Sequence, residues 1–226
     1  MKNLRTFGTG ALSDALGKTG AMDHEIKCRS ANPRMAGQAF TVRIHTADIL
    51  MVGRALSECP AGKVLVIDGR GAPNTALWGD LTTLAARVKK LAGVVIDGAI
   101  RDMRRVQKDA LPVFARSVVP NAGGAEYVGE LSVPVSCGGV PVSPGDWVVG
   151  DEDGVVVIPA ARLQEVVAKA KLIVAAERKI ERALRAGADL SELLRFSERI
   201  ERKKNEVFLP QLSSRPIRDS ASVRRP

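Results

Sequence analysis

The central part of the chain combines two continuous apolar runs with one helical pattern. The runs at 63–69 (KVLVIDG) and 94–97 (VVID) are typical of strands that are buried on both faces. Between them, apolar residues recur at helical spacing from 80 to 92, and Gly93 ends this predicted helix. The glycine-rich stretch 69–79 is predicted to be a loop. Together these segments predict a βαβ unit, and hence an α/β fold.

The flanking segments predict further strands and helices. Residues 36–46 alternate between apolar and polar positions, which favours a strand. Residues 133–158 are β-like and rich in turns. The other predicted elements are helices over 11–19, 48–57, 102–108, 159–185 and 189–204, and a strand over 112–116. We therefore expect a main domain over residues 1–195, followed by a charged helix and a disordered basic tail over 196–226.

Charge is concentrated at the C-terminus. The 226 residues carry a formal charge of +9, and residues 195–226 hold nine Lys/Arg against four Asp/Glu, hence +5 of that excess. Aromatic residues make up only 4% and do not alternate with basic ones, which argues against a single-stranded nucleic-acid platform. No apolar run reaches the roughly 20 residues of a membrane span. We expect a cytoplasmic protein that binds neither membrane nor nucleic acid.

Cysteine and histidine give little sign of a metal or disulfide framework. The three cysteines are scattered without a CxxC pair, so small buried side chains are expected. His45 ends a predicted strand and has no companion at metal-ligand spacing. Asp146, Asp151 and Asp153 are turn-forming residues that lack the later Glu of a calcium loop. Asp97, which precedes a glycine, is expected to be structural.

Three charged residues at the ends of the predicted βαβ unit are the main candidates for chemistry. Asp80 opens the predicted helix, and Arg101 and Asp102 follow the second buried strand. A helix that returns along its strand can bring these ends together. A guanidinium suits a carboxylate or an enolate, and a carboxylate can hold a hard cation. Pattern alone favours the plainer interpretation, in which Asp80 is a helix cap and Arg101-Asp102 form a solvated turn or salt bridge.

Backbone groups add to this candidate site. The N–H groups from Gly79 to Thr82, with Asp80 and Leu81 between, begin a helix and can bind an anion. An anionic substrate held between these donors, Arg101 and a metal at Asp102 would be stabilised as an enolate. Asp80 could then orient or activate a water.

The sequence resembles the RraA-like family, which includes class II 4-hydroxy-4-methyl-2-oxoglutarate/4-carboxy-4-hydroxy-2-oxoadipate aldolases. The signature of that family is an acid, twenty residues, then Arg-Asp, and here Asp80 is separated from Arg101-Asp102 by residues 81–100. Further matching text includes LSDALGKTGAMD, GQAFTV, KVLVIDGRG, GVVIDGAIRD and PGDWVVGDEDGVVVIP. The resemblance implies a swivelling β/β/α fold with C-terminal helices, assembled as a trimer or hexamer with active sites between subunits.

The resemblance also implies roles for individual residues. The backbone of Gly79, Asp80, Leu81 and Thr82 would bind the pyruvyl end of the substrate, and Arg101 would stabilise the enolate. Asp102 would hold Mg²⁺ or Mn²⁺, and Asp80 would orient the water that protonates the enolate. A glutamate from a neighbouring subunit completes the family's aldolase site; Glu177 is the first candidate here and Glu181 the second.

The implied activity is metal-dependent cleavage of a 4-hydroxy-2-oxo acid to pyruvate and a second oxo acid. Oxaloacetate decarboxylation would proceed through the same pyruvate enolate. The alternative implied by the family is a regulator that inhibits a ribonuclease by binding it.

Overall fold

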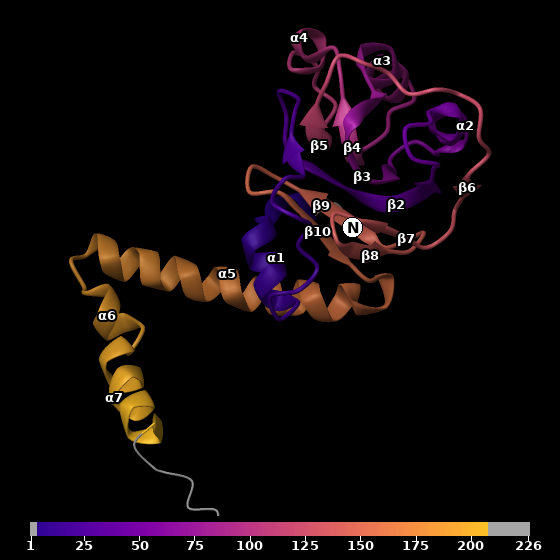
Figure 1. The fold of residues 1–226 in the computed structure, drawn as a ribbon. Coiled ribbons are helices and arrows are strands. Elements are labelled where there is room, and N and C mark those ends of the chain that lie inside the picture. Colours follow the sequence, from indigo (N-terminus) through magenta and orange to yellow (C-terminus); the bar gives the residue numbers. More distant parts are fainter. Residues whose placement is uncertain (1–3, 208–226) are drawn as a thin grey trace, which may run out of the picture. The chain divides into compact units, whose positions relative to one another are not determined.

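The computed structural model describes residues 4–207 and forms a mixed α/β fold (Figure 1). Its strands are β1 (Lys27–Cys28), β2 (Met35–Arg43), β3 (Val64–Trp78), β4 (Gly93–Ile100), β5 (Val113–Val118), β6 (Glu130–Leu131), β7 (Val135–Cys137), β8 (Val140–Val142), β9 (Trp147–Gly150) and β10 (Val155–Ile158). Its helices are α1 (Thr9–Ala15), α2 (Leu50–Glu58), α3 (Asp80–Val88), α4 (Met103–Val106), α5 (Leu163–Arg185), α6 (Leu190–Leu193) and α7 (Phe196–Val207), with 3₁₀ turns at Leu4–Thr6 and Ala160–Arg162.

The main sheet is parallel at its centre and antiparallel at its edges. Its order is β1-β5-β4-β3-β2-β9-β10, with β6 also pairing with β2. Strands β2, β3, β4 and β5 run parallel to one another, whereas β1, β6, β9 and β10 pair antiparallel. Strands β7 and β8 form a separate hairpin.

Both faces of the central strands are covered. On β3, Leu65 and Ile67 pack with residues of α2 and α3, whereas Val64 and Val66 pack against residues of the β7–β8 hairpin. Successive side chains of a strand point to opposite faces, so an unbroken apolar run is what a doubly covered strand requires. The resulting layers are helices, main sheet and hairpin, in agreement with the expected β/β/α fold (Figure 1).

A third apolar cluster joins α1 and the first part of α5 to the outer strands. Val166 and Ala170 of α5 are buried against Val156 and Ile158 of β10. The predicted apolar stripe of the long helix is thus confirmed where it meets the sheet. The helix itself begins at Leu163, after the 3₁₀ turn, rather than at Pro159.

The predicted loop over 69–79 is wrong. Strand β3 continues to Trp78, and its pairing with β4 extends to Trp78 opposite Ile100. Register shifts after Ile67 explain the glycine-rich sequence, because bulges require irregular backbone, and Arg70 and Gly71 both have positive φ. The composition of residues 69–78 is typical of a loop, although their hydrogen bonding to β4 continues.

Two predicted helices also differ in extent or in the face that they bury. Helix α3 ends at Val88, and Lys90 with φ 58° turns the chain toward β4. Its buried residues are Thr83 and Ala86, whereas the predicted apolar stripe is largely exposed. The predicted helix over 189–204 is two helices, α6 and α7, separated where Arg195 adopts φ 53°.

The chain divides into two compact units, residues up to Ala176 and residues from Glu177 onward. The first contains the sheet and its covering helices; the second contains the end of α5 together with α6 and α7. The predicted domain boundary after residue 195 remains a prediction, and most of the predicted disordered tail lies outside the described residues. Among residues 4–207, no helix is long and apolar enough to cross a membrane.

Candidate active site

The candidate site forms where β3 and β4 end side by side. The two strands are parallel neighbours, so the residues that follow them emerge at the same edge of the sheet. The Arg101 N–H donates to the Trp78 carbonyl at 2.9 Å, which extends the ladder one residue beyond β4. Asp80 at the start of α3 therefore lies beside Arg101 and Asp102, although twenty residues separate them in sequence.

The first turn of α3 is held by internal hydrogen bonds. The Gly79 N–H donates to Thr82 Oγ1 at 2.9 Å, and the Leu81 N–H donates to Asp80 Oδ1 at 2.8 Å. The Asp80 N–H points at Asp102 Oδ2, at 3.3 Å. The helix N-terminus thus already attracts carboxylate oxygens, as expected of an anion-binding end. A substrate anion that used these N–H groups would replace side-chain oxygens.

Asp102 is held in an unusual backbone conformation. It is the N-cap of α4 and adopts the left-handed region, with φ 59° and ψ 34°. Its Oδ2 lies 3.5 Å from Arg101 Nε. A Cβ added to Gly79 would lie only 2.5 Å from this oxygen, so a glycine at 79 is what allows the carboxylate to approach α3.

One pocket of about 210 Å³ is lined by all of the predicted site residues except the two glutamate candidates, Glu177 and Glu181. Its charged and backbone groups come from Gly79, Asp80, Leu81, Thr82, Arg101 and Asp102, and its other walls come from Ile49, Ala76, Leu77, Trp78 and Ala122. The side chains of Arg101 and Asp102 remain 45% and 38% exposed, so both can meet a ligand that enters from solvent. The walls Ile49 and Ala122 were not predicted, because they come from segments distant in sequence.

Arg105 is a site neighbour that the sequence pattern did not reveal. Its Nη1 lies 2.6 Å from Asp80 Oδ2. This guanidinium, supported by the Leu81 N–H, holds the pKa of Asp80 below its ordinary value. The available signal was spacing: Arg105 follows Asp102 by three residues at a helix start, which places both on one turn.

The donor set at this site fits a hard divalent cation that keeps most of its waters. Asp102 offers a partly exposed carboxylate, and Mg²⁺ is commonly held by one or two carboxylates plus water. Within residues 4–207 no cluster of three His, Cys, Asp or Glu side chains could form a complete protein cage. Glu177 is exposed on α5 and is the first residue of the second unit.

A loop over residues 119–129 supplies the pocket wall that contains Ala122. Asp48 is buried and accepts hydrogen bonds from the N–H groups of Leu50, Glu126 and Tyr127 at 2.9, 2.7 and 3.1 Å. Burial by itself would raise the pKa of Asp48, but these donors lower it below the ordinary 3.8. Nearby His45 stacks at a tilt on Tyr127, with ring centres 5.3 Å apart.

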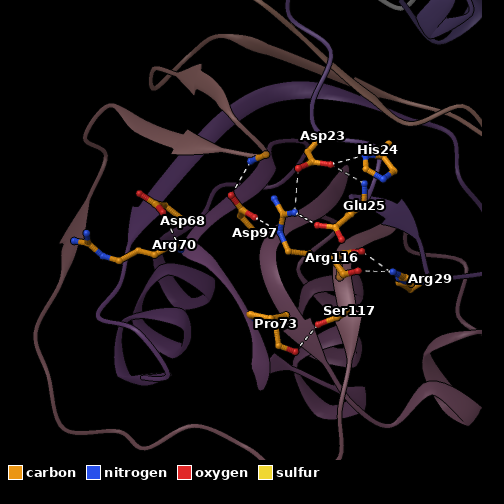
Figure 2. A network of polar contacts seen from close by, with 12 residues as sticks. Asp23, His24, Glu25, Arg29, Asp68, Arg70, Pro73, Asp97, Arg116 and Ser117 are labelled. Atoms are coloured by element: carbon orange, nitrogen blue, oxygen red, sulfur yellow. Dashed lines mark hydrogen bonds and ion pairs between the residues drawn. The ribbon is translucent and has the colours of Figure 1, made fainter.

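A second polar network, which shares no residue with the pocket, is built around Arg116 of β5 (Figure 2). Arg116 bonds to Asp97 at 2.8 Å, to Asp23 at 3.1 Å and to Glu25. The other Asp97 oxygen accepts the Gly138 N–H at 2.7 Å. Asp97 therefore ties β4 to β5 and to the β7–β8 hairpin, in keeping with the predicted structural role.

Cysteines and turn aspartates take no part in the pocket. Cys59 and Cys137 are buried, Cys28 is half-buried, and no disulfide links them. Burial raises the pKa of the Cys59 thiol to about 11, which keeps it protonated. Asp151 accepts hydrogen bonds from the Thr9 N–H and hydroxyl, both at 2.7 Å, and so fastens the start of α1.

Comparison with known proteins identifies the group to which this fold and site belong. The family model described as RraA-like, Aldolase/RraA, matches residues 9–157. A relative from Halalkalibacterium halodurans is 40% identical over 180 residues, covering 80% of this chain and 86% of its own, and is provisionally named a 4-hydroxy-4-methyl-2-oxoglutarate aldolase. The chain belongs to the RraA-like family.

Solved structures agree with this assignment. A protein of uncharacterised function from Pseudomonas syringae pv. tomato matches with a TM-score of 0.78 and 29% identity, over 86% of this chain and 92% of its own. A Thermus thermophilus protein described as the RNA-processing inhibitor RraA matches with a TM-score of 0.63 and 35% identity, over 67% and 92%. Relatives of this chain thus carry names from two functional classes.

Proposed function

We propose that this protein is a divalent-metal-dependent lyase that cleaves a 4-hydroxy-2-oxo acid to pyruvate and a second oxo acid. The substrate is of the 4-hydroxy-4-methyl-2-oxoglutarate or 4-carboxy-4-hydroxy-2-oxoadipate type. The observation that carries the proposal is the convergence of a helix N-terminus, a guanidinium and a partly exposed carboxylate in one pocket. Family membership and the name of the Halalkalibacterium relative support it.

Each residue has a distinct part in the proposed cleavage. The Arg101 guanidinium binds the 2-oxo oxygen and stabilises the negative charge that develops there as the C3–C4 bond breaks. The backbone N–H groups of Gly79 and Thr82 at the start of α3 bind the pyruvyl carboxylate. Asp80 orients the water that delivers a proton to the methylene carbon of the enolate. The C4 hydroxyl gives its proton to a solvent water, and its O–H electron pair forms the carbonyl of the second product as the C3–C4 pair passes to the enolate.

Asp102 would hold Mg²⁺ or Mn²⁺, with Glu177 of a neighbouring subunit as a further candidate ligand. The cation supplies Lewis-acid polarisation of the 2-oxo group and neutralises charge beside the substrate. Without it, the carboxylates of Asp80 and Asp102 would repel an incoming anion. Decarboxylation of oxaloacetate belongs to the same proposal, because loss of CO₂ from that acid also leaves pyruvate enolate.

We propose that the active protein is a homo-oligomer, a trimer or a hexamer, with its sites between subunits. The supporting feature is an apolar stripe on α3 formed by Leu81, Leu84 and Val88, which are 74%, 44% and 71% exposed. This stripe begins beside the pocket. Burying the stripe against another subunit would remove apolar area from water. It would also let that subunit line the open side of the pocket.

The test is pyruvate release, coupled to a dehydrogenase, from 4-hydroxy-4-methyl-2-oxoglutarate and from oxaloacetate. With Mg²⁺ present we expect turnover; EDTA should abolish it and added Mg²⁺ or Mn²⁺ should restore it. Arg101→Ala should lower kcat about 100-fold or more, because it removes the main donor to the developing oxyanion. Activity that persisted in EDTA, or in Arg101→Ala at the original rate, would contradict the mechanism.

A second candidate function is inhibition of a ribonuclease by protein binding. It is favoured by the description of the Thermus relative as an RNA-processing inhibitor. The Arg101→Ala protein separates the two functions, since an inhibitor that acts through its outer surface should retain inhibition of an RNA-degrading endonuclease while a lyase loses turnover.

A further inference from the structure

Asp80 lies at the boundary between two pockets. One is the candidate active site, which Arg101 and Asp102 also line. The other, of about 200 Å³, lies between α3 and α4 and is lined by Asp80, Arg105 and further residues of both helices. Arg105 belongs only to this second pocket. The Asp80 carboxylate is therefore held by a residue that does not line the candidate active site.

The contacts of Asp80 leave its carboxylate little freedom. Oδ2 is paired with Arg105 at 2.6 Å, and Oδ1 accepts the Leu81 N–H at 2.8 Å. The Asp80 side chain is only 19% exposed, whereas that of Arg105 is 78% exposed. Because the Arg105 side chain is mostly exposed, the ion pair contributes little to the stability of the fold. Its effect is expected on the orientation of the Asp80 carboxylate.

The backbone joins Arg105 to the other side of the site. The Arg105 N–H donates to the Asp102 carbonyl at 2.9 Å, because Asp102 is the N-cap of α4, a single helical turn. Asp102 reaches the Asp80 N–H from the start of this turn, and Arg105 reaches the Asp80 carboxylate from its third residue. One helical turn thus holds both the backbone and the side chain of Asp80.

We propose that Arg105 is a positioning residue that directs the Asp80 carboxylate for protonation of the enolate and keeps it from pairing with Arg101. The inference rests on the proposed function. Asp80 and Arg101 line the same pocket, and a carboxylate released from Arg105 would be attracted to the other guanidinium. That pairing would occupy the donors that the 2-oxo oxygen needs, and would remove the acceptor that orients the water.

The experiment measures exchange of the pyruvate methyl protons with D₂O by NMR, in the full chain with Mg²⁺. This exchange reports formation and reprotonation of the enolate, which is the step assigned to Asp80. Arg105→Gln should slow it about 10- to 100-fold, the order of loss caused by misplaced catalytic groups. Arg105→Lys should recover part of the rate, because it restores the positive charge. Arg104→Gln, one residue earlier on α4, removes the same charge outside both pockets and should exchange at the unsubstituted rate.

A double-substitution cycle tests whether Arg105 acts through Asp80. In the Asp80→Asn background, the further change Arg105→Gln should slow exchange less than twofold, since the group that it positions is already altered. The melting temperatures of all variants, followed by circular dichroism, should agree closely. Independent, multiplicative losses, or an unchanged rate in Arg105→Gln, would overturn the inference while leaving the proposed function intact. Unsubstituted exchange in Asp80→Asn, or no exchange in the unsubstituted protein, would contradict the proposed function and overturn the inference with it.

Discussion

At the scale of single residues, Arg116 illustrates the difference between a charged network and a catalytic one. Its side chain is 12% exposed, and that of Asp97 is 8% exposed. Partial burial alone would lower the pKa of Arg116, but the carboxylates of Asp97, Asp23 and Glu25 raise it above its ordinary value. Arg116 therefore stays charged, and its ion pairs join the segment containing Asp23 and Glu25 to β4 and β5 (Figure 2).

Replacing Arg116 by methionine should destabilise the fold markedly. The substitution keeps a similar length but leaves the buried Asp97 carboxylate without its cation, a change that costs about 3–5 kcal/mol in comparable pairs. Urea denaturation followed by circular dichroism measures the loss. Arg54→Met is the matched control, because Arg54 forms an exposed helical pair with Glu58 and should cost less than about 1 kcal/mol. Equal losses for the two variants would contradict a structural role for the network.

At the scale of elements, the sequence predicted the central βαβ unit because its pattern is set by burial. Strand β4 is buried at every position, and its run of apolar residues was recognised for that reason. The continuation of β3 through 69–78 was missed, since a bulged strand uses glycine and polar residues as a loop does. The apolar positions of α3 were identified, but their periodicity could not tell whether they face the core or the surface, and Leu81, Leu84 and Val88 are exposed.

The candidate site, too, could be predicted only in part. Asp80, Arg101 and Asp102 could be placed together, because parallel neighbouring strands end at one edge. The walls Ile49 and Ala122 could not, since they depend on which loop packs against which strand. The Asp48 contacts that hold the loop over 119–129 in place are of this kind. Arg105 was missed, although its spacing from Asp102 places both residues on one helical turn.

The stability that Asp48 gives to the loop over 119–129 should depend on pH. The pKa of Asp48 is lowered in the folded state, so its contribution to stability is complete well above 3.8 and is lost as the pH falls through the folded-state pKa. At about pH 7, Asp48→Asn should cost about 1–3 kcal/mol, because an amide opposes N–H donors with N–H groups of its own.

The difference in unfolding free energy between this variant and the unsubstituted protein should shrink as the pH falls through the folded-state pKa of Asp48, below which both proteins carry a neutral side chain at this position. Asp153→Asn, in the exposed turn of the β9–β10 hairpin, serves as the control and should show little effect at neutral or acidic pH. A difference in unfolding free energy that stayed constant as the pH fell would indicate that the charge of Asp48 does not contribute to stability.

At the scale of the whole molecule, the proposed oligomer can be tested on α3. Val88→Arg places a charge on the exposed stripe at the helix end farthest from the pocket, where a cation suits the helix dipole. We expect light scattering to show a shift toward monomer, with unchanged circular dichroism and a fall in pyruvate release. Val88→Leu keeps the stripe apolar and should retain both assembly and activity. A Val88→Arg protein that kept its mass would show that α3 is not part of the contact.

The left-handed backbone of Asp102 restricts which side chains can evolve at this position. Glycine, asparagine and aspartate tolerate that conformation best, whereas glutamate, the other carboxylate, is disfavoured there. If the proposed chemistry holds, the backbone at this position requires a residue that tolerates positive φ, and the cation requires a carboxylate oxygen. Aspartate is the residue that meets both requirements. A relative that had lost the reaction but kept the fold could therefore carry asparagine or glycine at the equivalent position without rebuilding the turn.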